Sequence, residues 1–139
     1  MRCAATISDG LVAGAVAAVL SGAPSTLHAF ATRASPFEAT LAAGALLLPR
    51  ERRPLVLALA ALPLHLALSL GWAVLLAAVL PRRRTVAYAT LAGLAIAALD
   101  LGVVGRRMPR IRALAPLPQV LDHVAYGATV GAVLSRRRG

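Results

Sequence analysis

The sequence has no lysine, one cysteine and few aromatic residues. Its fifteen basic residues are all arginines and only five residues are acidic, so the formal net charge is +10. The single cysteine, Cys3, excludes a disulfide within the chain and a cysteine-based metal site. Aromatic residues make up 4% of the chain, too few for the stacking surfaces of many nucleic-acid-binding proteins. The arginines lie in short clusters between apolar runs, which favours anionic lipid head groups over nucleic acid as neighbours.

The stretch Leu55–Leu80 is apolar and contains no acidic residue and no arginine. At ~1.5 Å per residue it would form a helix roughly 39 Å long, whereas the hydrocarbon core of a bilayer is about 30 Å thick. Arginine clusters flank it on both sides, at residues 50–53 and 82–84. The 139-residue chain is 59% hydrophobic. These observations predict a single integral membrane domain, and Leu55–Leu80 is one of its spans.

Three other apolar runs are also predicted to cross the membrane. The four expected spans cover residues 9–31, 55–80, 85–105 and 119–135. The first run could instead be a signal peptide cleaved near residues 21–23. A single arginine before the run and Pro24 directly after the cut are unfavourable for cleavage, so a retained span is the preferred interpretation. Pro24 is expected to kink the far end of this span.

A short apolar helix is predicted over residues 36–48, between the first two spans. Ser35 at the N-cap, Pro36 at the first helical position and Glu38 two residues later form a capping-box pattern. The helix should end before Pro49. At roughly 20 Å it is too short to cross a bilayer.

The expected fold is therefore an all-α polytopic membrane helix bundle with four transmembrane helices and one short non-spanning helix. An even number of crossings puts both termini on the same side of the cell membrane. The two sides would carry seven and eight arginines, close to a tie under the positive-inside rule. The triplets at residues 82–84 and 136–138 directly abut span ends, which favours cytoplasmic termini.

Small residues recur every four positions in several of the predicted spans. Such ridges allow two helices to approach closely in a bilayer. The first and fourth spans are therefore expected to pack through their ridges. The small residues assigned to helix packing are Gly10, Gly14, Ala18, Gly22, Gly93, Gly127 and Gly131.

Ionisable residues inside a membrane span are costly and are candidates for function by default. If the second and third spans form an antiparallel hairpin, His65 lies opposite Asp100. Folding the fourth span back places Asp122 and His123 at a similar depth, and Tyr126 shares a face with Asp122. These five residues are the candidate ligand or proton site, with the closest contact expected between His65 and Asp100.

A structural role for this polar cluster is the preferred interpretation, because interhelical polar contacts can simply hold a bundle together, and a ligand or proton site is the alternative. Two histidines and two aspartates at an inferred depth do not define a metal site. No nucleophile-elbow, zinc-protease or phosphate-loop pattern occurs. The sequence therefore indicates no catalytic residues, no metal and no cofactor.

Three stretches, GAPSTLHA, ALDLGVVGRR and DHVAYGATVGAVL, resemble segments of small multi-pass membrane proteins of high-GC bacteria with no assigned activity. The resemblance implies a membrane location and four helices, and it transfers no activity. The expected function is a non-enzymatic membrane component or helper subunit. A small permease-like protein, or one that binds a proton or ligand at the His/Asp site, is the alternative. Expected partners are the lipid bilayer, a second copy or another membrane protein.

Overall fold

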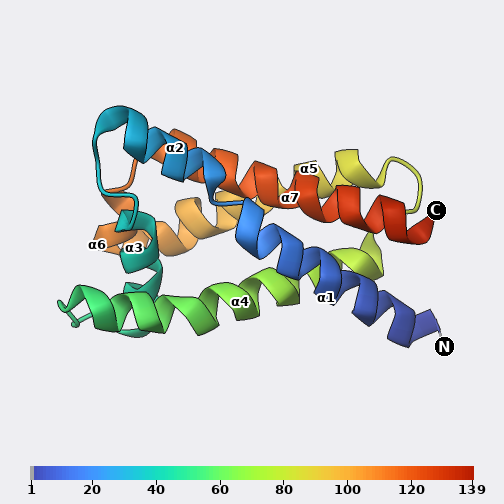
Figure 1. Ribbon diagram of the computed structural model, residues 1–139, viewed down its shortest axis with the longest axis horizontal. Helices are drawn as coiled ribbons and strands as arrows, with labels where there is room; N and C mark the ends of the chain where they lie inside the picture. The colour runs from blue at the N-terminus through green and yellow to red at the C-terminus, as the bar shows by residue number, and fades with distance from the viewer. Residues whose placement is uncertain (1) are drawn as a thin grey trace.

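The computed structural model describes residues 2–139, with side chains from residue 4 onward. The described part is helical and contains no strand. In chain order its elements are α1 (Arg2–Leu20), α2 (Ala23–Thr32), α3 (Glu38–Leu47), α4 (Pro54–Val79), α5 (Thr85–Leu99), the π-helix η1 (Asp100–Val104), the 3₁₀-helix η2 (Gly105–Arg107), α6 (Pro109–Arg112) and α7 (Pro116–Arg138). The beginning of α1, the α4–α5 hairpin and the end of α7 lie at one end of the molecule, and α3 and α6 lie at the other (Figure 1).

Three helical stretches are long and apolar enough to cross a membrane: Ala4–Thr32, Pro54–Val79 and Thr85–Arg107. They coincide with the first three predicted spans, and α4 continues through Pro63 without interruption. The helix α7 is 23 residues long but is not among the three. Its polar residues, including Asp122 and His123, and its terminal arginines lower its apolar character. Length and composition therefore establish three membrane-length helices, and they do not establish the fourth crossing.

The first of these stretches contains a break where the sequence predicted a kink. α1 ends at Leu20 and α2 begins at Ala23, so the helix is interrupted at Ser21 and Gly22. Pro24 explains the position of the break. A proline ring clashes with the carbonyl four residues earlier, here that of Leu20, yet is well tolerated in the first turn of a new helix. The interruption therefore lies before the proline.

The short helix forms but begins later than predicted. α3 starts at Glu38 rather than at Pro36, and the Phe37 amide donates to Ser35 Oγ over 3.3 Å. The Ser35 side chain therefore accepts from the amide two residues later in a local turn and does not cap the first turn of α3. The expected capping box does not form. α3 is ten residues long, about 15 Å, and cannot cross a bilayer by itself. It packs against α4, where Gly44 allows contact with the Leu57 carbonyl.

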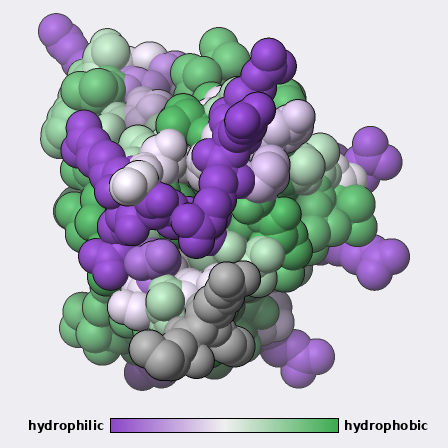
Figure 2. Space-filling model, turned by 90° about the vertical axis from the view of Figure 1, so that its right-hand side faces the viewer, coloured by the Kyte–Doolittle hydropathy of each residue, from purple (hydrophilic) through white to green (hydrophobic). Residues whose placement is uncertain are grey.

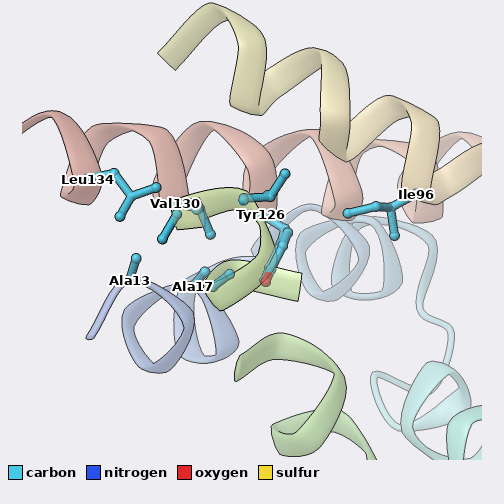
Figure 3. Close-up of a cluster of buried hydrophobic side chains, with 9 residues drawn as sticks. Ala13, Ala17, Ile96, Tyr126, Val130 and Leu134 are labelled. Atoms are coloured by element: carbon cyan, nitrogen blue, oxygen red, sulfur yellow. The ribbon is translucent and has the colours of Figure 1, made fainter. Parts of the chain in front are cut away.

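The helix α7 is the central element of the bundle. It packs against α5, α1 and α2, whereas α4 packs against α1 and α3. Val130 and Leu134 of α7 are fully buried and point toward Ala13 and Ala17 of α1 (Figure 3). The least apolar of the long helices is thus shielded on several sides by the more apolar ones.

The small-residue ridges pack closely, but with partners other than those predicted. A Cβ atom added at Gly14 would lie 2.8 Å from the Ser69 carbonyl oxygen of α4, and one added at Gly127 would overlap the Ala89 carbonyl of α5. The first span therefore uses its glycines against α4, and the fourth uses its glycines against α5. The reason is that α5 places Gly93 directly opposite Gly127. Two helices approach more closely when both have small residues at the contact than when only one does. Gly22 differs from the other ridge residues, since an added Cβ atom would meet nothing within 4 Å.

Apolar flanks and hydrophilic ends divide the surface. Figure 2 looks onto the end that contains the α4–α5 hairpin and the end of α7, where hydrophilic side chains gather above hydrophobic sides. Many large apolar side chains are exposed along the flanks, among them Val19, Leu59 and Leu91. This distribution suits a body surrounded by hydrocarbon and solvated at its two ends.

Candidate functional site

The break between α1 and α2 is closed by side chains from two other helices. The Nε2 atom of His65, on α4, lies 2.9 Å from the carbonyl oxygen of Ala18 in the last turn of α1. The Ser25 amide, in the first turn of α2, donates to Asp122 Oδ1 of α7 over 2.9 Å. One side chain thus supplies a donor to the end of α1, and the other supplies an acceptor to the start of α2.

A helix end leaves carbonyl or amide groups without intrahelical partners. In hydrocarbon no water is present to replace these partners, so each unsatisfied group costs several kcal/mol. A carboxylate at a helix N-terminus is also favoured by the helix dipole. His65 and Asp122 therefore have a clear structural task, which is to stabilise the interrupted first helix.

Tyr126 links three helices at a third point. Its buried hydroxyl, on α7, donates to the Ser69 carbonyl of α4 over 2.5 Å. Gly14 of α1 lies against the same carbonyl. A larger residue at position 14 would displace the group that Tyr126 binds, so this contact also serves packing.

Asp100 and His123 form the remaining contact among the predicted site residues. Asp100 Oδ2 and His123 Nε2 are 3.1 Å apart, and the other ring nitrogen of His123 lies 2.8 Å from the Gln119 carbonyl oxygen. Asp100 is the first residue of the π-helix η1, where the Gly105 amide donates to the Asp100 carbonyl. Single π-turns inside longer helices are found frequently at functional sites. This is an ion-pair geometry between two side chains, unlike the contacts of His65, Asp122 and Tyr126 with backbone atoms.

The predicted contact between His65 and Asp100 is therefore replaced by two separate contacts. The prediction assumed that α4 and α5 lie side by side along their length. The two helices are connected by the hairpin at residues 80–84, but α4 packs mainly against α1 and α3, and α5 mainly against α7. The depth estimate for the fourth span was closer, since His123 does reach Asp100.

A small cavity of about 200 Å³ is lined by two neighbours of the Asp100–His123 pair, although not by the pair itself. Gln119, whose carbonyl faces the His123 ring, and Leu101, which follows Asp100, both line it. The other lining residues come from η2, α6 and the linker that follows: Gly105, Ile111, Arg112, Leu114 and Pro116. The cavity is therefore formed by the arginine-rich loop before α7 together with residues one position and one helical turn away from the pair.

Two arginines of the C-terminal triplet have partners that the sequence analysis missed. Arg137 Nε donates to Asp9 Oδ1 over 2.8 Å, which joins the end of α7 to α1. The Arg138 guanidinium donates to the Ala77 carbonyl near the end of α4. Cations are favoured at helix C-termini, and the shared location of both termini was the sequence signal for these contacts. Arg136 stays exposed.

The loop before α4 contains a second, local ion pair. Glu51 accepts hydrogen bonds from the Arg53 guanidinium and from the backbone amides of Arg53 and Arg52. These bonds, chiefly the one from the Arg53 side chain, lower the pKa of the Glu51 carboxyl to about 2. Glu51 therefore stays ionised at ordinary pH and neutralises one arginine of this loop.

Among the residues that the structure describes, no group of three or more histidine, cysteine or acidic side chains is arranged to hold a metal ion. Protein-family models, curated protein sequences and solved structures were compared with the chain, and none of them matches it.

Proposed function

We propose that this protein is an integral membrane protein that crosses the bilayer four times and acts as a membrane component or helper subunit rather than as an enzyme. The first three crossings would be made by the three membrane-length helices. α7 would make the fourth, surrounded by α1, α2 and α5. Both termini would face the cytoplasm, and the resemblance to small multi-pass proteins of high-GC bacteria belongs to the same proposal.

The observation that carries this proposal is the use of the polar residues within the apolar helices, of which His65 is exposed and Asp122 and Tyr126 face neighbouring helices. His65, Asp122 and Tyr126 contact backbone groups of neighbouring helices. Each contact fixes one helix against another, and two of them complete a broken helix. Such contacts favour a body that holds a fixed shape in the membrane and presents its apolar flanks to lipid, a second copy or another membrane protein.

Cysteine-accessibility labelling tests the four crossings. In a Cys3→Ser background, single cysteines at Ser35 and Arg50 should be labelled from the same side of the membrane, because α3 does not cross. Cysteines at Arg110 and Arg136 should be labelled from opposite sides, because α7 does. Labelling of Arg110 and Arg136 from one side would overturn the fourth crossing.

Native mass spectrometry of the protein in lipid nanodiscs tests the role as a component. A helper subunit should retain a second copy or another membrane protein. A protein that remains monomeric after mild extraction, with or without bound lipid, would contradict the role as a subunit.

A permease-like or proton-binding protein is the second candidate. The specific observation in its favour is the Asp100–His123 pair, whose two side chains contact each other, are partly exposed and contact no backbone break.

A further inference from the structure

Both ring nitrogens of His123 face hydrogen-bond acceptors. Nδ1 lies 2.8 Å from the Gln119 carbonyl oxygen, and Nε2 lies 3.1 Å from Asp100 Oδ2. A carbonyl oxygen carries no hydrogen, so the contact with Gln119 is a hydrogen bond only when Nδ1 bears a proton and donates it. The contacts with Gln119 and with Asp100 are therefore both hydrogen bonds only when Nδ1 is protonated.

The contact with Asp100 then requires one more proton. Nε2 and Oδ2 would present lone pairs to each other unless a proton lies between them. Two arrangements satisfy the contact: an imidazolium beside a carboxylate, or a neutral imidazole beside a carboxylic acid. Both have a net charge of zero, so the pair is neutral only while it holds this shared proton.

No other charged group among the described residues takes over the role of this proton in neutralising the Asp100 carboxylate. Asp122 is the other carboxylate near the ring, and it is engaged by the Ser25 amide. No arginine of the described chain forms an ion pair with Asp100. Arg112 lines the nearby cavity and Arg110 is half-buried on the same short helix, but neither forms an ion pair with Asp100. The hydroxyl of Tyr126 on α7 is engaged by the Ser69 carbonyl. The remaining titratable or charged groups on elements next to α7 or continuous with α5 are exposed or lie at the opposite end: Asp9, His28, Tyr88, Arg106, Arg107 and the terminal arginines of α7.

The pair is also positioned to exchange its proton. The side chains of His123 and Asp100 keep 22% and 38% of their surface exposed. Loss of the shared proton would leave a net charge of −1 and two opposed lone pairs in a medium of low dielectric, where repulsion is strong. The irregular backbone of η1 begins at Asp100 itself.

We infer, on the basis of the four crossings proposed above, that Asp100 and His123 form a single-proton binding site and that release of this proton moves η1 away from α7. In the step the Nε2–Oδ2 hydrogen bond breaks, the proton passes to water at the exposed side of the pair, and the pair becomes a monoanion. Rebinding a proton restores the neutral pair and the contact between η1 and α7.

Electron paramagnetic resonance tests the movement directly. Spin labels at Val103 and Leu121, both exposed, report the separation of η1 and α7 in a Cys3→Ser protein reconstituted in phosphatidylcholine vesicles. The label-to-label distance should increase reversibly at one midpoint when the pH is raised from about 5 to about 10. In Asp100→Asn the transition should be lost, because an amide N–H can donate to Nε2 without a titrating proton.

His123→Gln supplies a second variant that should also lose the transition. Asp122→Asn is the matched control, since it changes the adjacent carboxylate and should keep the transition. A distance that does not respond to pH, an Asp100→Asn protein that responds like the unmodified one, or a loss of the response in Asp122→Asn would each overturn the site. Labelling at Arg110 and Arg136 on the same vesicles separates this failure from a failure of the four crossings.

Discussion

At Ser21 and Gly22 the first apolar helix stops and restarts as α2, and at Asp100 the helix that begins as α5 widens into the π-turn η1. Both irregularities lie in helices long enough to cross a membrane, where unsatisfied backbone groups are expensive. At the first, side chains from α4 and α7 bind the free backbone groups. At the second, the widened turn bonds to itself, since the Gly105 amide reaches the Asp100 carbonyl.

This difference decides which polar side chains remain available for function. At the break in the first helix, His65 and Asp122 bind free backbone groups of α1 and α2. The π-turn requires no side chain from outside, so the Asp100 carboxylate is free to face His123. The same residue types, one histidine and one aspartate, thus contact backbone groups at one irregularity and contact each other at the other, where we propose that they exchange a proton.

The largest expected effect comes from the glycine that allows α7 to approach the helix leading to the π-turn. Gly93→Ala would force a Cβ atom into the His123 carbonyl oxygen, whereas Gly22→Ala at the first break would meet open space. We expect Gly93→Ala to lower the free energy of unfolding in detergent by about 1–3 kcal/mol or more. Gly22→Ala should change it by no more than about 0.5 kcal/mol. Equal stability of the two variants would show that the two regions are packed alike.

A somewhat smaller effect is expected from Asp122→Ala. The variant removes the acceptor for the Ser25 amide, and loss of an N-terminal cap costs about 0.5–2 kcal/mol. Asp122→Asn keeps an acceptor oxygen and should recover much of the loss. Hydrogen exchange at the Ser25 amide measures the effect locally. If the Ser25 amide is equally protected from exchange in Asp122→Ala, the Asp122 carboxylate does not cap α2.

Tyr126→Phe should be milder still. Its hydroxyl binds the Ser69 carbonyl within the continuous helix α4, so removing it leaves no broken helix without a partner. An interhelical hydrogen bond in a membrane protein contributes about 0.6 kcal/mol on average, and we expect a loss of that order in thermal unfolding. If Tyr126→Phe loses more stability than Asp122→Ala, the hydrogen bond between α7 and α4 contributes more than the one that caps α2 at the break.

The smallest effect concerns the loop outside both irregularities. The Glu51 carboxyl has a pKa lowered to about 2 because it accepts hydrogen bonds from Arg53. Its contribution is therefore fully present above about pH 4.5 and is lost as the pH falls through about 2. The pair is exposed to solvent, so only local order should change. Hydrogen exchange at the Arg52 and Arg53 amides, measured against pH in the unmodified protein and in Glu51→Gln, checks this prediction. The same pH response in both proteins would exclude Glu51 as its source.

The long helices were predictable because a long apolar run without charge can satisfy its backbone hydrogen bonds in a bilayer by forming a helix. Leu55–Leu80 became α4 with its ends shifted by a single residue. Pro24 located the irregularity in the first helix, but it did not predict that the helix would break rather than kink. A proline can kink a helix or begin a new one, and the contacts from His65 and Asp122 favour the second outcome.

The candidate residues were identified more accurately than their partners. Composition alone selects an aspartate or histidine inside an apolar helix. Partner choice depends on which helices lie side by side, and the hairpin suggested α4 with α5. The structure pairs α5 with α7 instead because Gly93 and Gly127 permit a close approach there. The terminal contact of Asp9 with Arg137 depends on the same three-dimensional arrangement.

Nitrogen-15 NMR of histidine-labelled protein in bilayers tests most directly whether the two irregularities use their polar residues differently. His65 should carry its proton on Nε2, because that atom donates to the Ala18 carbonyl, and His123 should carry one on Nδ1, because that atom donates to the Gln119 carbonyl. Asp100→Asn should shift the Nε2 resonance of His123 and leave His65 unchanged. An unprotonated Nδ1 on His123, or a response of His65 to the change at Asp100, would contradict the account.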